Sequence, residues 1–98
     1  MDSYNYNNLK SLIGQVINVI DNANHQATLV ITDVIRSQIN GDEWDAFSVI
    51  YQGSSDFHIP QGTYTLVHPE FGEKQLFLTP NSENEYETVI TRKKQAVV

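Results

Sequence analysis

Apolar and polar residues alternate with a period of two through most of the chain after Gly14, a pattern typical of β-strands. Clusters of Asn, Gly, Pro and Ser separate the alternating segments at intervals of about ten residues. The segments that this pattern predicts as strands are 15–20, 27–39, 44–52, 63–68, 74–79 and 85–92. Six short strands joined by turns predict an all-β fold, a small antiparallel barrel or sandwich.

Two connections carry clear turn chemistry. Asn40-Gly41 tolerates positive φ at both positions and predicts a type I′ hairpin between the second and third strands. Pro69 cannot donate to a strand ladder and Gly72 can take a left-handed conformation. Residues 69–73 therefore predict a five-residue loop between the fourth and fifth strands.

One helical turn is predicted near the N-terminus. Leu9, Leu12 and Ile13 have the spacing of one helix face, and Gly14 ends the pattern. We expect this turn to form an apolar lid over one open end of the sheet.

The chain of 98 residues and 11.1 kDa has the size and composition of a single globular domain. We predict one β domain over residues 1–98, with a loose, asparagine-rich lead-in over 1–8 and a ragged tail over 93–98.

Several predicted strands carry apolar residues on both faces. In the third strand, one face holds Trp44, Ala46, Ser48 and Ile50, and the other holds Asp45, Phe47, Val49 and Tyr51. In the fifth strand, Phe77 opposes Leu76 and Leu78. A small closed barrel should have one polar face. The second apolar set thus predicts either a sandwich that curls on itself or an interface with another chain.

The charge distribution argues against nucleic acid as a partner. The net charge is −6, and residues 1–91 hold 3 basic and 12 acidic side chains, a net charge of −9. Such a surface repels phosphate backbones.

The longest aliphatic run, residues 29–31, is too short to cross a bilayer, and no signal-peptide pattern occurs. We expect a soluble, cytoplasmic protein with no membrane partner.

The chain has no cysteine, which excludes disulfides, thiolate metal sites and cysteine nucleophiles. His58 and His68, with Asp56 and Glu70 nearby, are the best metal candidates, but they are separated by a turn-rich stretch. Histidines at such strand ends are expected to be exposed or bonded to a loop carbonyl. His25, in a predicted turn, is expected at the surface. We therefore predict no metal and no cofactor.

No catalytic constellation is evident. The acidic residues form two clusters, Asp42, Glu43 and Asp45, and Glu83, Glu85 and Glu87. Period-two spacing places Glu85 and Glu87 on one outward face, where both stay ionised, whereas a paired-carboxylate hydrolase needs one desolvated acid. We interpret these clusters as a solvated edge that discourages aggregation. Ser54 and Ser55 lack the Gly-x-Ser-x-Gly elbow of a serine nucleophile.

Four aromatic residues, Trp44, Phe47, Tyr51 and Tyr64, could form a platform for stacking sugars. Core packing explains them better, because three of them fall in one predicted strand and share its two faces.

Three motifs resemble a small bacterial family, domain-of-unknown-function family 6916. The motifs are Phe47-Ser48-Val49-Ile50-Tyr51-Gln52-Gly53, Pro60-Gln61-Gly62-Thr63-Tyr64 and His68-Pro69-Glu70-Phe71-Gly72-Glu73. The opening Leu12-Ile13-Gly14-Gln15 and the closing Tyr86-Glu87-Thr88-Val89 are also similar. Phe71 stands where the family more often has leucine, and Ser54-Ser55 replaces a frequent proline.

The resemblance implies a small β-rich domain without established activity, frequently encoded near phage-tail-collar-like proteins. The residues of these motifs are expected to determine turns of the fold. Pro60 fixes the entry to the fourth strand, Gly62 allows the turn into it, and residues 68–73 close the next hairpin. The resemblance therefore transfers no catalytic or binding role.

We expect a non-enzymatic module that makes protein–protein contacts or self-associates, as an accessory of a phage-tail-like or surface assembly. An alternative is a small-molecule or glycan binder that uses Trp44, Tyr51 or Tyr64 at a barrel mouth. A weaker alternative is a hydrolase built on His58, His68 and Asp56.

Overall fold

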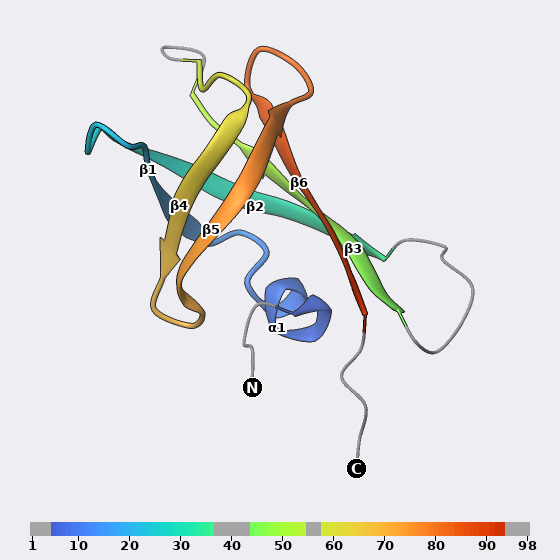
Figure 1. Ribbon diagram of the computed structural model, residues 1–98. Helices are drawn as coiled ribbons and strands as arrows, with labels where there is room; N and C mark the ends of the chain where they lie inside the picture. Colours follow the sequence, from blue (N-terminus) through green and yellow to red (C-terminus); the bar gives the residue numbers. More distant parts are fainter. Residues whose placement is uncertain (1–4, 37–43, 55–57, 94–98) are drawn as a thin grey trace.

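The computed structural model describes residues 5–36, 44–54 and 58–93 of the chain. Within these ranges one helix is followed by six strands, coloured along the sequence in Figure 1. The elements are α1 (Tyr6–Ser11), β1 (Val16–Ile20), β2 (Gln26–Arg36), β3 (Trp44–Gln52), β4 (Gly62–His68), β5 (Gly72–Pro80) and β6 (Glu85–Lys93). Each predicted strand is present. The predicted Asn40-Gly41 turn lies outside the described residues.

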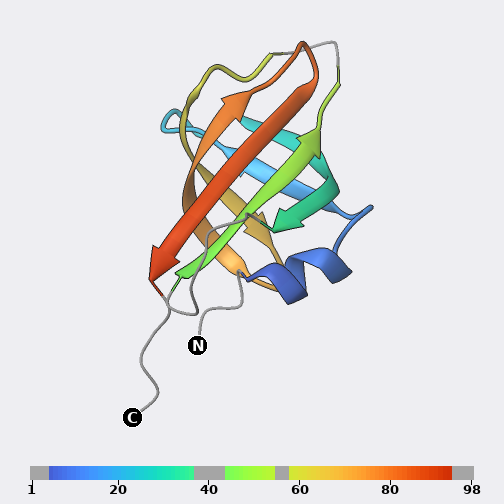
Figure 2. The same cartoon turned by 90° about the vertical axis from the view of Figure 1, so that its right-hand side faces the viewer.

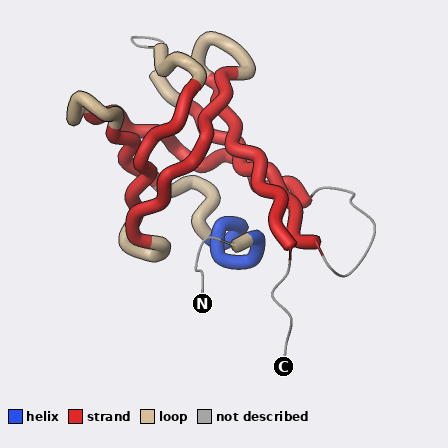
Figure 3. The backbone as a smooth tube through the Cα atoms, viewed as in Figure 1, coloured by secondary structure: helices blue, strands red, loops and turns tan. Residues whose placement is uncertain are grey.

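The strands form a closed antiparallel barrel in the order β1-β2-β3-β6-β5-β4, which confirms the predicted all-β class and selects the barrel over the sandwich. Figure 3 shows the strands wrapping around a common interior, with α1 at one end. The ladders are unequal in length. β3 and β6 pair along nine positions, whereas β1 and β4 pair at three and β5 and β6 at two. Two short seams therefore close the barrel.

Alternate side chains of each strand fill the interior, as the period-two pattern predicts. Phe47, Val49 and Tyr51 of β3 are buried, and so is Tyr86 of β6. The buried apolar core comprises Leu9, Leu12, Ile17, Val19, Leu29, Ile31, Val34, Phe47, Val49, Tyr51, Ile59, Leu66, Phe71, Leu78 and Tyr86. Interior packing thus accounts for Phe47, Val49 and Tyr51 of β3.

Helix α1 covers one end of the barrel, so the predicted lid is confirmed (Figure 1). Leu9 and Leu12 point into the core, and Tyr6 meets the ring of Phe47 edge to face at 6.4 Å. Ile13, the third member of the predicted apolar face, is 40% exposed because it follows the end of the helix.

The predicted loose lead-in over residues 1–8 is too long. Asn5 caps the helix, because its side-chain oxygen accepts a hydrogen bond from the Asn8 N–H at 3.0 Å. The helix therefore begins at Tyr6. At the other end of the chain, β6 includes Lys93, the first residue of the predicted tail.

The predicted five-residue loop between β4 and β5 is also corrected. His68 pairs with Gly72, which leaves only residues 69–71 in the loop. Gly72 has a φ of +74°, so its predicted left-handed conformation is confirmed. The short loop is possible because Gly72 adopts this conformation and the Phe71 N–H donates back to the His68 carbonyl at 3.2 Å.

Candidate functional site

The histidines of the candidate metal and hydrolase sites lie far apart in the fold. His58 comes before β4 and His68 ends it, so this strand separates them. Asp56 lies outside the described residues. Over the described ranges, no group of three or more His, Cys, Asp or Glu side chains is placed to hold a metal ion. No helix among these residues is long and apolar enough to span a membrane.

His68 has a structural environment that the sequence did not predict. It is 6% exposed, and its Nε2 lies 2.9 Å from the side-chain oxygen of Gln15. Its Nδ1 accepts a hydrogen bond from the Glu70 N–H at 3.0 Å, and its ring stacks on Phe71. The expectation of an exposed histidine or one bonded to a loop carbonyl is therefore wrong for His68, whereas His58 is exposed as expected. His68 fastens the β4–β5 turn to the residue before β1.

The acidic face of β6 agrees with prediction. Glu85 and Glu87 lie on the same face, because the Asn81 side-chain amide donates to both carboxylates, at 3.4 and 3.0 Å. Asp42 and Glu43 lie outside the described residues.

The predicted surface position of His25 is confirmed by its 82% exposed side chain. The core-packing interpretation is confirmed for Phe47 and Tyr51, which are buried. Tyr64 of the proposed sugar platform lines a pocket, and the side chain of Trp44 lies outside the described part of the chain.

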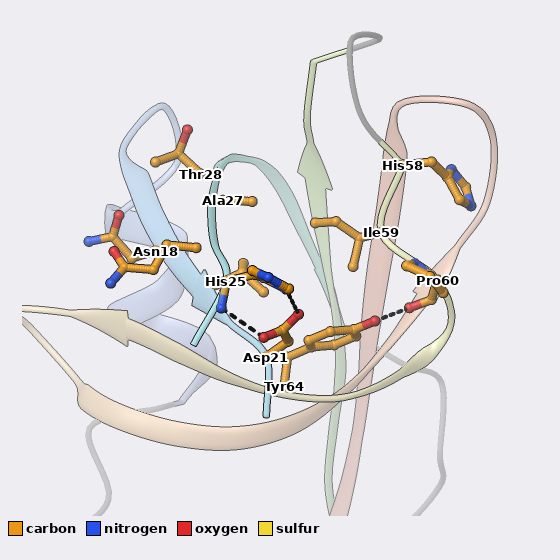
Figure 4. Close-up of a pocket in the computed structure, with 11 residues that line it drawn as sticks. Asn18, Asp21, His25, Ala27, Thr28, His58, Ile59, Pro60 and Tyr64 are labelled. Atoms are coloured by element: carbon orange, nitrogen blue, oxygen red, sulfur yellow. Dashed lines mark hydrogen bonds and ion pairs between the residues drawn. The ribbon is translucent and has the colours of Figure 1, made fainter. Parts of the chain in front are cut away.

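A pocket of about 540 Å³ opens at the end of the barrel opposite α1. The ends of β1, β2 and β4 and the segment 58–60 form its walls (Figure 4). The residues that line it are Asn18, Val19, Asp21, His25, Gln26, Ala27, Thr28, His58, Ile59, Pro60 and Tyr64. We refer to it as the mouth pocket.

Two tyrosine hydroxyls hold the segment 58–60 in place beside the mouth pocket. Tyr64 donates its hydroxyl proton to the Pro60 carbonyl at 2.6 Å, and the buried Tyr86 hydroxyl accepts from the Ile59 N–H at 2.9 Å. Burial raises the pKa of Tyr64 above its ordinary value, and the nearby charge of Asp21 adds to this shift. Tyr64 therefore remains a neutral hydrogen-bond donor. The two hydroxyl hydrogen bonds hold the segment 58–60 in place, so this wall of the pocket is preformed.

Asp21 organises the turn from β1 to β2 on the opposite wall. Its Oδ1 accepts from the N–H groups of Ala23 and His25 at 2.9 and 2.8 Å, and its Oδ2 lies 3.1 Å from His25 Nδ1. The bond from the His25 N–H is the main cause that lowers the pKa of Asp21 below its ordinary value. No local sequence pattern indicates that Asp21 lines a pocket, because only the folded barrel brings it opposite β4.

A row of exposed apolar side chains crosses the outer wall of the barrel. Ile35 of β2 pairs with Ser48 of β3, and Ser48 pairs with Val89 of β6. Val89 is 64% exposed and Ile35 is 51% exposed. Phe77, also 51% exposed, lies on β5 two residues before Thr79, and Thr79 pairs with Glu87, so period-two alternation places Phe77 on the same side of the wall as Glu87 and Val89. Figure 2 shows β5, β6, β3 and the end of β2 side by side. We call Ile35, Val89 and Phe77 the apolar row.

A β-bulge produces part of this row. The β2–β3 register shifts between Ile31 and Asp33, and Val34 rather than Asp33 points into the core. The inserted residue reverses which side chains face outward, so that Ile35 comes to the surface.

Carboxylates border the apolar row on one side. Asp33 and Glu87 both pair with Ile50, in the register position next to the row, and Glu85 follows along β6. We call Asp33, Glu85 and Glu87 the acidic border. The outer wall thus combines an exposed apolar strip with a negative edge.

A family model described as "Domain of unknown function (DUF6916)" matches residues 4–90, which is most of the chain. The chain belongs to this family. Searches of the curated proteins and of the solved structures found no match to the chain.

The motifs of this DUF6916 domain have structural roles in the barrel. In residues 60–64, the Tyr64 hydroxyl bonds back to the Pro60 carbonyl, as in the tyrosine corners of other β folds. In residues 68–73, His68 accepts the Glu70 N–H and Gly72 supplies the left-handed position. Gly62 does not have a positive φ, so the turn into β4 does not require a glycine backbone there.

Proposed function

We propose that this DUF6916 domain is a non-enzymatic docking module that binds a protein partner through the apolar row. The observation that carries the proposal is the alignment of Ile35 and Val89 across one register line of the outer wall, with both side chains at least half exposed. Exposed apolar side chains that are grouped on one face and bordered by polar residues are typical of protein–protein contact sites.

Charge favours a different protein over a second copy of this chain. The acidic border flanks the row, and the chain carries a net charge of −6, so two copies repel each other. A partner with an apolar contact patch and a basic rim complements both features. The partner that we propose belongs to a larger particle of the phage-tail-like kind, in line with the gene neighbourhood that the family resemblance implies.

The non-enzymatic part of the proposal is supported by the hydrogen bonds that the polar side chains already make within the barrel. His68 fastens a turn, and the hydroxyls of Tyr64 and Tyr86 hold the segment 58–60. These groups stabilise the barrel through their hydrogen bonds, so a structural role accounts for them without a reaction.

Site-specific photo-crosslinking in the cells that make the protein tests the proposal. A benzoylphenylalanine at position 89 or 77 should give one discrete adduct with a different protein, whereas the same group at Asn7, exposed on α1, should give none. Because the partner is expected to have a basic rim, Glu87→Lys should reduce the adduct yield at least severalfold, and Glu73→Lys on β5 should not. Circular dichroism checks that each variant is folded.

An adduct whose mass equals two copies of the chain would replace the proposed partner by a self-interface. Equal yields at positions 7 and 89, or a yield unaffected by Glu87→Lys, would refute docking through the row.

A further inference from the structure

The mouth pocket is separate from the apolar row and has the size of a ligand site. The row lies on the outer wall, whereas the pocket lies at the barrel end, between the β1–β2 turn and the segment 58–60. Its volume of about 540 Å³ falls within the range of small-molecule sites, roughly 300 to 1,000 Å³. Barrel mouths are a common place for such sites.

The walls of the mouth pocket are largely apolar. Val19 of β1 and Ala27 of β2 line the pocket. Figure 4 shows Ile59 and Pro60 on the facing segment. The hydrogen bonds of the two tyrosine hydroxyls already hold that segment, so a ligand need not order it. These walls suit a hydrocarbon ring or chain.

Asp21 and Tyr64 give the pocket a cation-binding corner. Ile20 pairs with Thr65 in the β1–β4 ladder, so the next position along each strand brings Asp21 opposite Tyr64. Figure 4 shows the two side chains together at the pocket, with the ring of Tyr64 beside the carboxylate. A carboxylate next to an aromatic face attracts an ammonium group both by charge and by the cation–π interaction.

The charge balance of the lining selects against anions. Asp21 is the one carboxylate among the lining residues, and no Lys or Arg lines the pocket in the part of the chain that the structure describes. The Asp21 carboxylate faces the His25 ring, which is 82% exposed and can turn away into solvent when a ligand cation takes its place.

A sugar fits this corner less well. The Tyr64 hydroxyl is already bonded to the Pro60 carbonyl, and Asp21 Oδ1 already accepts two backbone N–H groups. Each buried sugar hydroxyl would need a partner of its own. Asp21 Oδ2, which faces only the exposed ring of His25, serves a single amine that displaces this ring better than it serves a ring of hydroxyls.

We propose that the mouth pocket binds a small organic ammonium ion, with the amine between the Asp21 carboxylate and the Tyr64 ring and the hydrocarbon part against Ile59 and Pro60. This site is independent of docking through the apolar row.

Titration of the isotope-labelled protein with four probes, followed by ¹H–¹⁵N spectra, tests the site. The probes are phenethylamine, 2-phenylethanol, 3-phenylpropionate and methyl α-glucoside. Phenethylamine should shift the amide signals of Asp21, His25 and Tyr64 and should bind roughly tenfold more tightly than the neutral alcohol, because a charge-assisted contact is lost in the alcohol. The carboxylate should leave the spectrum unchanged.

Two substitutions separate the carboxylate from general effects of charge. Asp21→Asn keeps a side-chain oxygen for the turn amides but removes the charge, so it should weaken phenethylamine binding roughly tenfold. Asp33→Asn, which removes a carboxylate from the outer wall of β2, should leave binding unchanged. Val89→Ser should also leave it unchanged, because the row is not part of the pocket. The ¹H–¹⁵N spectrum of each variant shows whether it is folded.

Three affinity results would overturn the proposal. They are equal affinity for the amine and the alcohol, tighter binding of the glucoside than of the amine, and equal losses for Asp21→Asn and Asp33→Asn. Phenethylamine-induced shifts confined to residues outside the mouth pocket would overturn it as well.

Discussion

At the residue scale, two glycines of the family motifs differ in what their backbone requires. Gly72 has a φ of +74°, where an L side chain is strained, so Gly72→Ala should lower the free energy of unfolding by roughly 1–2 kcal/mol. A Cβ at Gly62 would lie 3.6 Å from the Tyr64 ring, an ordinary contact. Gly62→Ala should therefore change stability by less than about 0.5 kcal/mol. Urea unfolding measures both, and a larger loss at Gly62 than at Gly72 would contradict this account.

The same scale shows which residue environments the sequence could predict. The left-handed conformation of Gly72 is local, and turn chemistry alone predicted it. The burial of His68 depends on Gln15, a residue 53 positions away, so no local pattern could indicate it. The place of Asp21 in the mouth pocket likewise depends on the β1–β4 pairing. Tyr64 was a candidate from sequence because an aromatic residue beside a predicted barrel mouth is itself a signal.

At the scale of elements, the β1–β2 hairpin should be sensitive to acid. The His25 N–H donates to the Asp21 carboxylate and is the main cause of its lowered pKa. A group whose pKa is lower in the folded state stabilises the fold above its unfolded pKa, and this stabilisation is lost as the pH falls through the folded value. Amide exchange at Ala23 and His25 should therefore lose protection between roughly pH 5 and roughly pH 2.

Asp21→Asn is the matched control for the hairpin, because it preserves an acceptor but cannot titrate. In this variant, the protection of the two amides should show no loss with an acid midpoint. Identical pH profiles in the parent and the variant would show that another group controls the turn.

Element boundaries followed from the sequence where the signal was local. The strand pattern located β1 to β6, but a strict period of two along β2 would place Ile35 on the same face as Leu29 and Ile31. The bulge after Ile31 reverses this, and its position depends on how β2 meets β3. The predicted five-residue loop failed for a similar reason, since ladder pairing extends to His68 and Gly72.

At the scale of the whole molecule, the strand pattern could not distinguish a barrel from a sandwich. Both architectures need six strands with apolar inner faces. The barrel closes through the three pairs of the β1–β4 seam and the two pairs of the β5–β6 seam, which join segments distant in sequence. The surplus of apolar residues on outer faces was visible in the sequence. Only the register shows that Ile35 and Val89 lie on one line of the wall.

The balance between the apolar row and the net charge predicts how the isolated domain behaves in solution. At low ionic strength, the net charge of −6 should keep the chain monomeric, because like-charged copies repel each other over the long Debye length. At about 0.5 M salt this repulsion is screened, and weak association through the row should appear. Light scattering coupled to size exclusion should show the apparent mass rise with both salt and protein concentration.

Val89→Ser should remove this association, because it replaces the most exposed apolar side chain of the row. Val16 is also exposed but lies on β1 outside the row, so Val16→Ser should leave the association unchanged. A stable oligomer at low salt would mean that the row is a self-interface whose contacts outweigh the charge repulsion. In that case a second copy would occupy the row, the acidic border would lie at the rim of the self-interface, and docking of a different protein through the row would be refuted.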